Sequence, residues 1–217
     1  MPSFKAILFD LDGTLVSSEH LHLEAWDEML KNQGLHFDEE WFSNWIGVSD
    51  ASMAEQIATK YPLGMPWQDF LEAKRALFQR KAAGSIVPLA GVKDGLEAFF
   101  PFPMAVVTMS NLSDAMLSLE SAGLLSFFKT IVTADDVTNP KPDAEAYLTA
   151  AKRLGVAPAD CLAVEDSISG VGSAKAAGCY TLGVANSIDG EKLSMADEVF
   201  SDTEEAMAYI KQALFIG

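Results

Sequence analysis

Short apolar runs recur along the chain, and stretches with apolar residues at helical spacing lie between them. We expect buried strands over residues 4–9, 104–107, 130–132, 161–164 and 180–184, with a further edge strand over 198–200. Helices are expected over 114–122, 144–154 and 171–177, each followed by a glycine where helices commonly end. This alternation predicts an α/β fold: a Rossmann-like parallel sheet core with helices on both faces.

The segment after the first strand breaks this alternation. Apolar residues recur there at helical spacing without a strand-like run, and three of the four tryptophans lie in its first half. We therefore expect an inserted all-helical cap domain over residues 17–85, and a core domain formed by residues 1–16 and 86–217. Pro88 and Gly91 make the second connection a candidate hinge.

Composition narrows the choice of partners. The chain has 217 residues, of which 49% are hydrophobic, and this is enough for a packed core. A net charge of −16 argues against nucleic acid or an anionic membrane surface as a partner. A small phosphate ester remains compatible with this charge, because a bound metal ion and a lysine can reverse the potential locally.

Two cysteines, Cys161 and Cys179, lie in apolar or strand-like surroundings and do not form a C-x-x-C pair. We expect both to be buried free thiols in a reducing compartment. No leader pattern precedes the first strand, and no apolar run approaches the length of a membrane span. These features predict a cytoplasmic protein.

The strongest chemical signal is the sequence Asp10-Leu11-Asp12-Gly13-Thr14, which directly follows the first apolar run. Ligands bind at the carboxyl edge of parallel sheets, and two carboxylates this close repel unless a cation or proton lies between them. Oxygen ligands of this kind suit magnesium. An EF-hand calcium loop fits poorly, because a third oxygen ligand before the glycine is missing, whereas an ordinary Asp-Gly turn at a strand end remains an alternative.

Two further segments carry side chains suited to an anion. Thr108, Met109 and Ser110 follow an expected strand, where hydroxyl and main-chain N–H groups suit a phosphate, although an ordinary helix cap explains them equally well. Lys141 lies between two prolines, either as a fixed cation for an anionic group or as a solvated lysine in a surface turn. With a phosphate bound, Thr108, Lys141 and the N–H groups of Met109 and Ser110 would hold the charge of its oxygens.

Glu165 and Asp166 directly follow another buried run, where adjacent acids are costly without a cation, so we interpret them as metal ligands. If these strand ends converge with Asp10 and Asp12, they form a magnesium-dependent phosphoryl-transfer site. Asp10 would attack phosphorus and form an aspartyl phosphate, and Asp12 would act first as the general acid and then as the general base. Magnesium would be held by Asp10, by the main-chain carbonyl of Asp12, and by Glu165 or Asp166.

The order of these motifs resembles the haloacid dehalogenase superfamily over essentially the whole chain. The matching residues are Asp10-x-Asp12-Gly13-Thr14, Thr108, Lys141-Pro142 and Glu165-Asp166-Ser167. The helical insertion resembles the C1-cap subfamily, and the most similar branch looks like the β-phosphoglucomutases and phosphoglycolate phosphatases. This resemblance implies the roles given above, and an aspartate at the position of Asp12 implies phosphoryl transfer rather than dehalogenation. Met109 stands where relatives often have a small residue, and Ser17 where many carry an aspartate.

The cap is expected to determine the substrate, because the core binds little beyond the phosphate. His22 lies where related caps often carry a histidine facing the site, although a structural role is equally compatible with its position. Gly47-Val48-Ser49-Asp50 resembles the substrate loop of such caps, in which β-phosphoglucomutase has an arginine for a second phosphate at the position of Asp50. A carboxylate there would repel a phosphate, which favours a phosphatase over a mutase. Three basic cap residues are candidate distal anion contacts, with a solvated helix face as the simpler interpretation: Lys74, Arg75 and Lys81.

Three functions remain open at this stage. The first is a magnesium-dependent phosphatase for a small monoester such as a sugar phosphate or phosphoglycolate. The second is a phosphomutase, and the third is a protein that binds phosphorylated ligands without turnover. The intact pair of Asp10 and Asp12 argues against pure binding. We expect a monomer whose partner is a small-molecule phosphate ester, with neither nucleic acid nor a membrane involved.

Overall fold

The computed structural model describes residues 4–215, apart from the side chains of Glu39, Ser43 and Phe215. Within these residues, six parallel strands form one sheet in the order β3-β2-β1-β4-β5-β6. The strands are β1 (Ala6–Phe9), β2 (Met104–Val107), β3 (Thr130–Val132), β4 (Cys161–Glu165), β5 (Tyr180–Val184) and β6 (Glu198–Phe200). Since β1 lies between β2 and β4, the segments that follow these three strands meet at the centre of one sheet edge.

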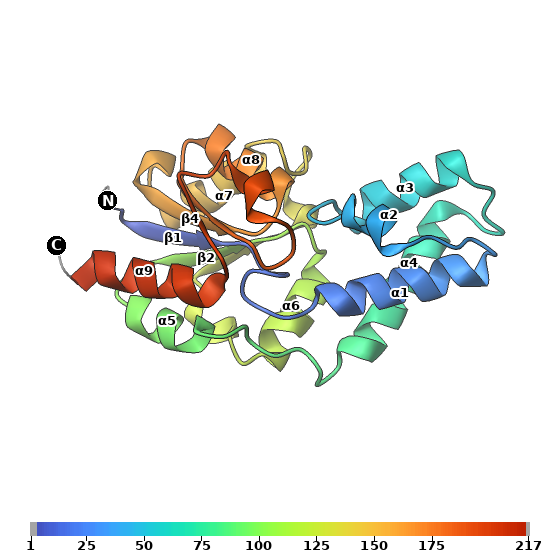
Figure 1. The fold of residues 1–217 in the computed structure, drawn as a ribbon, viewed down its shortest axis with the longest axis horizontal. Coiled ribbons are helices and arrows are strands. Elements are labelled where there is room, and N and C mark those ends of the chain that lie inside the picture. Colours follow the sequence, from blue (N-terminus) through green and yellow to red (C-terminus); the bar gives the residue numbers. More distant parts are fainter. Residues whose placement is uncertain (1–3, 216–217) are drawn as a thin grey trace.

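Helices cover both faces of this sheet. They are α5 (Val92–Phe99), α6 (Leu112–Ser121), α7 (Glu145–Leu154), α8 (Ile168–Ala177) and α9 (Thr203–Phe215). Helices α7 and α8 lie on one face, and α5, α6 and α9 lie on the other (Figure 1). Side chains alternate along β1 and so reach both layers: Ile7 and Phe9 pack in the same cluster as Ile210 of α9, whereas Leu8 packs in the cluster of Tyr147 of α7.

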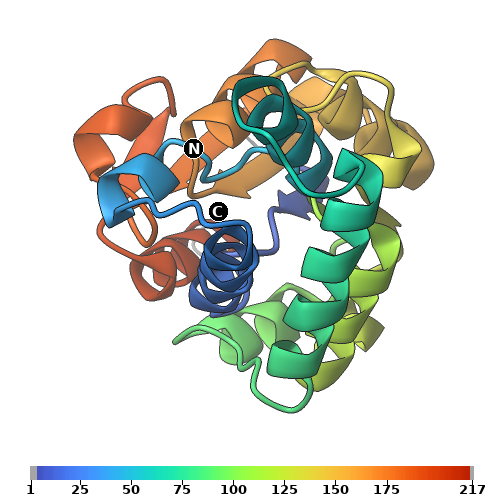
Figure 2. The same cartoon turned by 90° about the vertical axis from the view of Figure 1, so that its right-hand side faces the viewer.

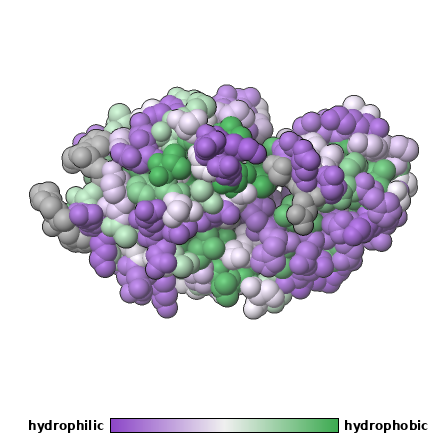
Figure 3. All heavy atoms as spheres, in the orientation of Figure 1, coloured by the Kyte–Doolittle hydropathy of each residue, from purple (hydrophilic) through white to green (hydrophobic). Residues whose placement is uncertain are grey.

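The inserted segment forms a lobe at the side of the sheet (Figure 1). Its helices are α1 (Glu19–Asn32), α2 (Glu39–Ser43), α3 (Asp50–Lys60) and α4 (Trp67–Ala82). Figure 2 views the molecule from this lobe, with α1 and α4 in front of the sheet. These two helices pack against each other through apolar faces that include Ala25 and Phe78. Figure 3 shows a hollow between the lobe and the sheet domain.

The predicted α/β fold with a parallel sheet is confirmed, and several helices differ from expectation. Helix α6 begins at Leu112, two residues earlier than expected, and helix α9 was not expected. Helix α8 begins at Ile168, three residues earlier than expected, because the Ser167 hydroxyl caps it by accepting from the Gly170 N–H at 3.0 Å. Helix α5 was not expected. Gly91, interpreted as part of a hinge, adopts a φ of +74° and directly precedes this helix.

Cys161 and Cys179 are both free and buried, as predicted. Within the described part of the chain, no helix is both long and apolar enough to cross a bilayer. The face shown in Figure 3 is mainly hydrophilic, in keeping with the net charge of −16.

Candidate active site

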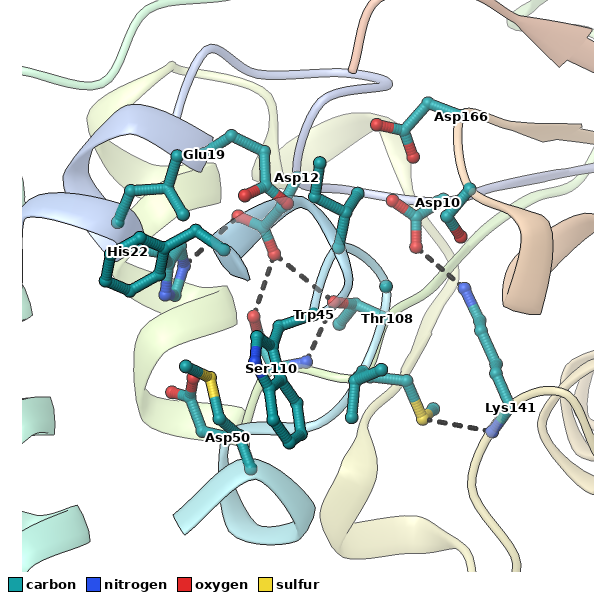
Figure 4. Close-up of a pocket in the computed structure, with 18 of the residues that line it drawn as sticks. Asp10, Asp12, Glu19, His22, Trp45, Asp50, Thr108, Ser110, Lys141 and Asp166 are labelled. Carbon is teal, nitrogen blue, oxygen red and sulfur yellow. Dashed lines mark hydrogen bonds and ion pairs between the residues drawn. The ribbon is translucent and has the colours of Figure 1, made fainter. Parts of the chain in front are cut away.

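Three adjacent strand ends bring the predicted chemical groups into one pocket (Figure 4). Asp10 follows β1, Thr108 follows β2, and Glu165 ends β4. The core side of the pocket is lined by Asp10, Asp12, Thr108, Ser110, Lys141 and Asp166. The inserted helices and their loops line the opposite side with Glu19, His22, Trp45 and Asp50.

The chain turns sharply after Asp12, at Gly13. The φ of Gly13 is +81°, in the left-handed region that glycine adopts without strain. A Cβ atom at this position would collide with the carboxylate of Asp166 and the hydroxyl of Ser187. Asn186 supports the turn by donating from Nδ2 to the Gly13 carbonyl at 2.7 Å. Glycine is therefore required here by the backbone and by the close approach of Asp166.

Lys141 is the buried cation of the site. Its Nζ donates to Asp10 Oδ1 at 2.7 Å, to Glu165 Oε1 at 2.5 Å and to the Val107 carbonyl at 2.8 Å. The alternative of a solvated lysine in a surface turn is therefore wrong. Burial alone would lower the pKa of Lys141, but the carboxylates of Asp10 and Glu165 raise it above its ordinary value. The ammonium group stays charged at neutral pH.

Three buried acids surround this lysine. Asp10, Glu165 and Asp166 can each offer a carboxylate oxygen, and these oxygens lie within 4.8 Å of one another. Burial raises the pKa of Asp10 well above its ordinary value, and burial followed by the charge of Glu165 does the same for Asp166. A single lysine does not balance three carboxylates, so this set of oxygen donors fits a divalent cation.

Within this group, Asp166 faces the pocket more directly than Glu165. Glu165 accepts at Oε1 from Lys141 and from the Tyr147 hydroxyl at 2.7 Å, and at Oε2 from the Ser167 hydroxyl at 3.3 Å. Both of its oxygens are therefore engaged inside the core. Asp166 lines the pocket and accepts at Oδ2 from the Ser187 hydroxyl. Of the two predicted acids, Asp166 is the better placed to hold a metal ion.

Asp12 lies among hydroxyl groups. Its Oδ1 accepts from Ser18 at 2.5 Å, and its Oδ2 accepts from Ser110 at 2.8 Å and from Thr108 at 3.4 Å. His22 Nε2 lies 3.6 Å from Asp12 Oδ1. Burial would raise the pKa of Asp12, but His22, Ser18 and Ser110 together lower it to about 2. The protein thus holds this side chain ready as a carboxylate.

Residues 108–110, which follow β2, make hydrogen bonds within the protein. The main-chain N–H of Ser110, predicted to hold a phosphate oxygen, donates to Thr108 Oγ1 at 3.0 Å. Met109 is 7% exposed, and its sulfur accepts from the Lys141 main-chain N–H at 3.4 Å. The large side chain of Met109 therefore packs against the loop that carries Lys141.

Glu19 was not predicted from the sequence, yet it lines the pocket beside Asp12 (Figure 4). It is the first residue of α1. Burial and then the Asp12 carboxylate raise the pKa of Glu19 to about 8, and Lys74 only partly offsets this.

A buried chain of polar groups links the inserted helices to Asp12. Lys74 Nζ donates to Asp50 Oδ2 at 2.6 Å and lies 2.8 Å from His22 Nδ1. Trp26 Nε1 donates to Asp50 Oδ1 at 2.9 Å. The side chain of Lys74 is 0% exposed, so its interpretation as part of a solvated helix face is wrong. Lys74 lies four residues from Phe70 and four from Phe78, which are both buried. This spacing could have placed Lys74 on the apolar face of α4.

The predicted substrate loop contacts the core directly. The Gly47 carbonyl accepts from Ser169 Oγ at 2.8 Å, and Gly47 has a φ of +76°. A Cβ atom on Gly47 would lie 2.5 Å from the Ser167 hydroxyl. Ser49 caps α3 by accepting from the Ser52 N–H at 3.3 Å. Of the loop residues, Gly47, Val48 and Asp50 line the pocket, whereas Ser49 is buried as a helix cap.

Comparison with known proteins identifies the family. The model of the haloacid dehalogenase-like hydrolase family matches residues 7–184. The chain belongs to this family. It is 34% identical to validoxylamine A 7'-phosphate phosphatase from Streptomyces hygroscopicus, over 93% of this chain and 95% of that protein. It is 30% identical to a phosphorylated carbohydrates phosphatase from Thermotoga maritima, over 97% and 100% of the two chains. The crystal structure of CbbY from Rhodobacter sphaeroides in complex with phosphate superposes with a TM-score of 0.84 at 27% identity, covering 93% and 96%.

Several residues of this haloacid dehalogenase-like hydrolase escaped prediction because nothing in the local sequence shows which acid they contact. Ser18 and Ser187 donate to Asp12 and Asp166, and Tyr147 donates to Glu165. A serine or tyrosine inside a predicted helix or loop carries no local signal of this kind. The packing of α7 and of the loop after β5 against the sheet edge brings Tyr147 and Ser187 to the acids, whereas Ser18 follows Asp12 by only six residues.

Proposed function

We propose that the protein is a magnesium-dependent phosphatase that hydrolyses a small phosphate monoester through an aspartyl phosphate on Asp10. One observation carries this proposal: Asp10, Asp12, Lys141 and Asp166 line a single pocket at the carboxyl edge of the sheet. The phosphatase names of the two relatives support it. The intact acid pair argues against a protein that only binds phosphorylated ligands.

Asp10 is the proposed nucleophile. Its hydrogen bond from Lys141 at 2.7 Å fixes the carboxylate, so the other oxygen is oriented for attack on phosphorus. The attack transfers the phosphoryl group to Asp10 and releases the alcohol. Lys141, the Thr108 hydroxyl and the main-chain N–H groups of Met109 and Ser110 would hold the phosphoryl oxygens, with Ser110 exchanging its bond to Thr108 for one to phosphate.

Asp12 is the proposed acid and base. In its protonated form it gives a proton to the leaving oxygen, and as a carboxylate it then takes a proton from the water that hydrolyses the aspartyl phosphate. The pKa of about 2 favours the carboxylate in the protein alone. A bound phosphate ester brings negative charge close to Asp12 and raises this pKa, which favours the protonated form that the first step needs.

Magnesium is the proposed cofactor, held by Asp10, the Asp12 main-chain carbonyl and Asp166. The excess of buried carboxylates over lysine supports a divalent cation at this place. When bound, the cation would neutralise charge on the phosphate oxygens. Glu165 is then a positioning residue, because it holds Lys141 between itself and Asp10.

The cap over residues 17–85 supports a monophosphate as substrate. Asp50, at the position where a mutase would need an arginine, is paired with the buried Lys74. This pair leaves no unpaired cation at that position for a second phosphate. His22, Trp45 and Asp50 offer polar and aromatic groups to a hydroxylated substrate, so we favour sugar or polyol phosphates. We further propose that the protein acts as a monomer in the cytoplasm.

The test is phosphate release with magnesium across a panel of esters. The panel contains hexose 1- and 6-phosphates, fructose 1-phosphate, glycerol phosphates, phosphoglycolate and nucleotides, and the Asp10→Asn variant is the control. We expect release from at least one sugar or polyol phosphate, and none by the variant. No release by the wild type, combined with isomerisation of a hexose phosphate that depends on a hexose bisphosphate, would support the phosphomutase instead.

A further inference from the structure

The side chain of Glu19 places a carboxyl group in the pocket, and the proposed reaction gives this group no role. The carboxyl group of Glu19 makes no hydrogen bond and no ion pair with the part of the chain that the structure describes. Its side chain nevertheless lines the pocket and points toward Asp12 (Figure 4). This carboxyl group is therefore free to bind a group of a substrate that enters the pocket.

The position of Glu19 indicates which part of the substrate it meets. The preceding residue, Ser18, is tied to Asp12 by a hydrogen bond of 2.5 Å, so Glu19 is held beside the proposed general acid. The phosphoryl group would lie on the other side, between Asp10, Lys141 and Thr108. Because Asp12 protonates the leaving oxygen, a group next to Asp12 faces the alcohol portion of the ester.

The surroundings of Glu19 favour a hydroxyl group as its partner. The charged groups that interact with Glu19 are the carboxylates of Asp12, Asp50 and Asp166 and the ammonium group of Lys74. Lys74 is already engaged with Asp50. A carboxyl group accepts hydrogen bonds through both of its oxygens, and a substrate hydroxyl in this pocket is a donor that fits it.

We propose that Glu19 is a specificity-determining residue that binds a hydroxyl group on the alcohol portion of the substrate, close to the ester oxygen. This inference rests on the proposed phosphatase function and deepens it. The substrate class is then a phosphate ester with a hydroxyl on a neighbouring carbon, as in sugar and polyol phosphates. Trp45 lines the same pocket and offers an apolar ring face to the carbon skeleton of such a substrate.

The experiment compares two kinds of ester in the full-length protein with magnesium. One is the best polyol or sugar phosphate of the panel, and the other is p-nitrophenyl phosphate, whose alcohol portion carries no hydroxyl group. We expect Glu19→Ala to lower the ratio of the two kcat/KM values roughly 10- to 100-fold, the size expected for a lost hydrogen bond to a substrate hydroxyl. Glu19→Gln keeps a donor and an acceptor, so it should lower the ratio less. Glu28→Ala, on the exposed side of the same helix, is the matched control.

Four other results would contradict the proposed role of Glu19 or the proposed function. A ratio within twofold of wild type in Glu19→Ala would show that Glu19 does not read the alcohol portion. An equal loss with both esters in Glu19→Gln, at unchanged melting temperature, would place Glu19 in the phosphoryl chemistry. A strong preference for phosphoethanolamine that disappears in Glu19→Ala would make the partner an ammonium group. A wild-type protein that hydrolyses neither ester would overturn the proposed function itself, so the two failures are distinguishable.

Discussion

The Ser169 hydroxyl donates a hydrogen bond of 2.8 Å to the Gly47 carbonyl, and this bond joins the core to the inserted helices. Ser169 lies in the first turn of α8, three residues after Asp166, and Gly47 lies in the loop before α3. The bond therefore closes the pocket directly beside the proposed metal ligand. Groups from both lobes face this one pocket (Figure 4).

Loss of the hydrogen bond between Ser169 and Gly47 should weaken the contact between the core and the inserted helices. Because a neutral hydrogen bond contributes about 1 kcal/mol, Ser169→Ala should lower kcat/KM about fivefold and raise KM. The melting temperature should change little, because only one partly buried neutral hydrogen bond is lost. Thr59→Ala removes a hydroxyl on the exposed side of α3 and serves as the control. Kinetics of Ser169→Ala that match those of wild type would mean that the bond does not contribute to closure.

Replacement of Asp12, the proposed general acid and base, should nearly abolish turnover. Asp12→Ala loses the proton donor to the leaving oxygen and the base for water, which together contribute a factor of about 100 or more. Steady-state phosphate release with the best ester of the panel measures the effect, and circular dichroism checks the fold. Residual activity above about a hundredth of wild type would argue against this role for Asp12.

Metal removal should inactivate the protein reversibly. EDTA should stop phosphate release, and added magnesium should restore it, because the buried carboxylates of Asp10 and Asp166 lack a sufficient counter-charge without a cation. Magnesium should also raise the melting temperature of the wild type by binding the folded state, and this rise should disappear in Asp166→Asn. Full activity in EDTA would exclude an essential metal.

The buried pair of Asp50 and Lys74 should contribute to stability. Asp50→Asn leaves the fully buried Lys74 without its anion and should lower the free energy of unfolding by about 3 kcal/mol at pH 7. The exposed pair of Asp27 and Lys31 is the matched control, and Asp27→Asn should cost less than about 1 kcal/mol. Urea denaturation measures both, and equal small effects would contradict the prediction.

The same pair predicts a dependence on pH. Burial would raise the pKa of Asp50, but Lys74 and then His22 lower it below its ordinary value of 3.8. A carboxylate with a lowered pKa stabilises the folded state above its unfolded pKa, and this contribution is lost as the pH falls through the folded pKa. The stability difference between wild type and Asp50→Asn should therefore be constant from pH 7 to about 5 and shrink below about pH 4. A constant difference down to pH 3 would contradict this origin.

The sequence predicted the core of the site better than the cap. Asp10, Thr108 and Glu165 follow or end buried strands, and the geometry of parallel sheets alone brings such strand ends together. Lys74 and Glu19 lie on helices whose position relative to the sheet depends on packing between the lobes. Local periodicity could have placed Lys74 on the buried face of α4, but its partners Asp50 and His22 come from two other segments. For the same reason, nothing local to α1 shows that Glu19 lines the pocket.

Asp10 is the residue that we expect to carry the phosphoryl group. The most direct measurement mixes the protein with a radiolabelled phosphate ester and magnesium, quenches in acid within milliseconds, and counts label bound to protein. We predict label on the wild type that hydroxylamine releases, as expected for an acyl phosphate, and none on Asp10→Asn. Phosphate release by the wild type without any label on Asp10, or equal labelling of Asp10→Asn, would contradict the account.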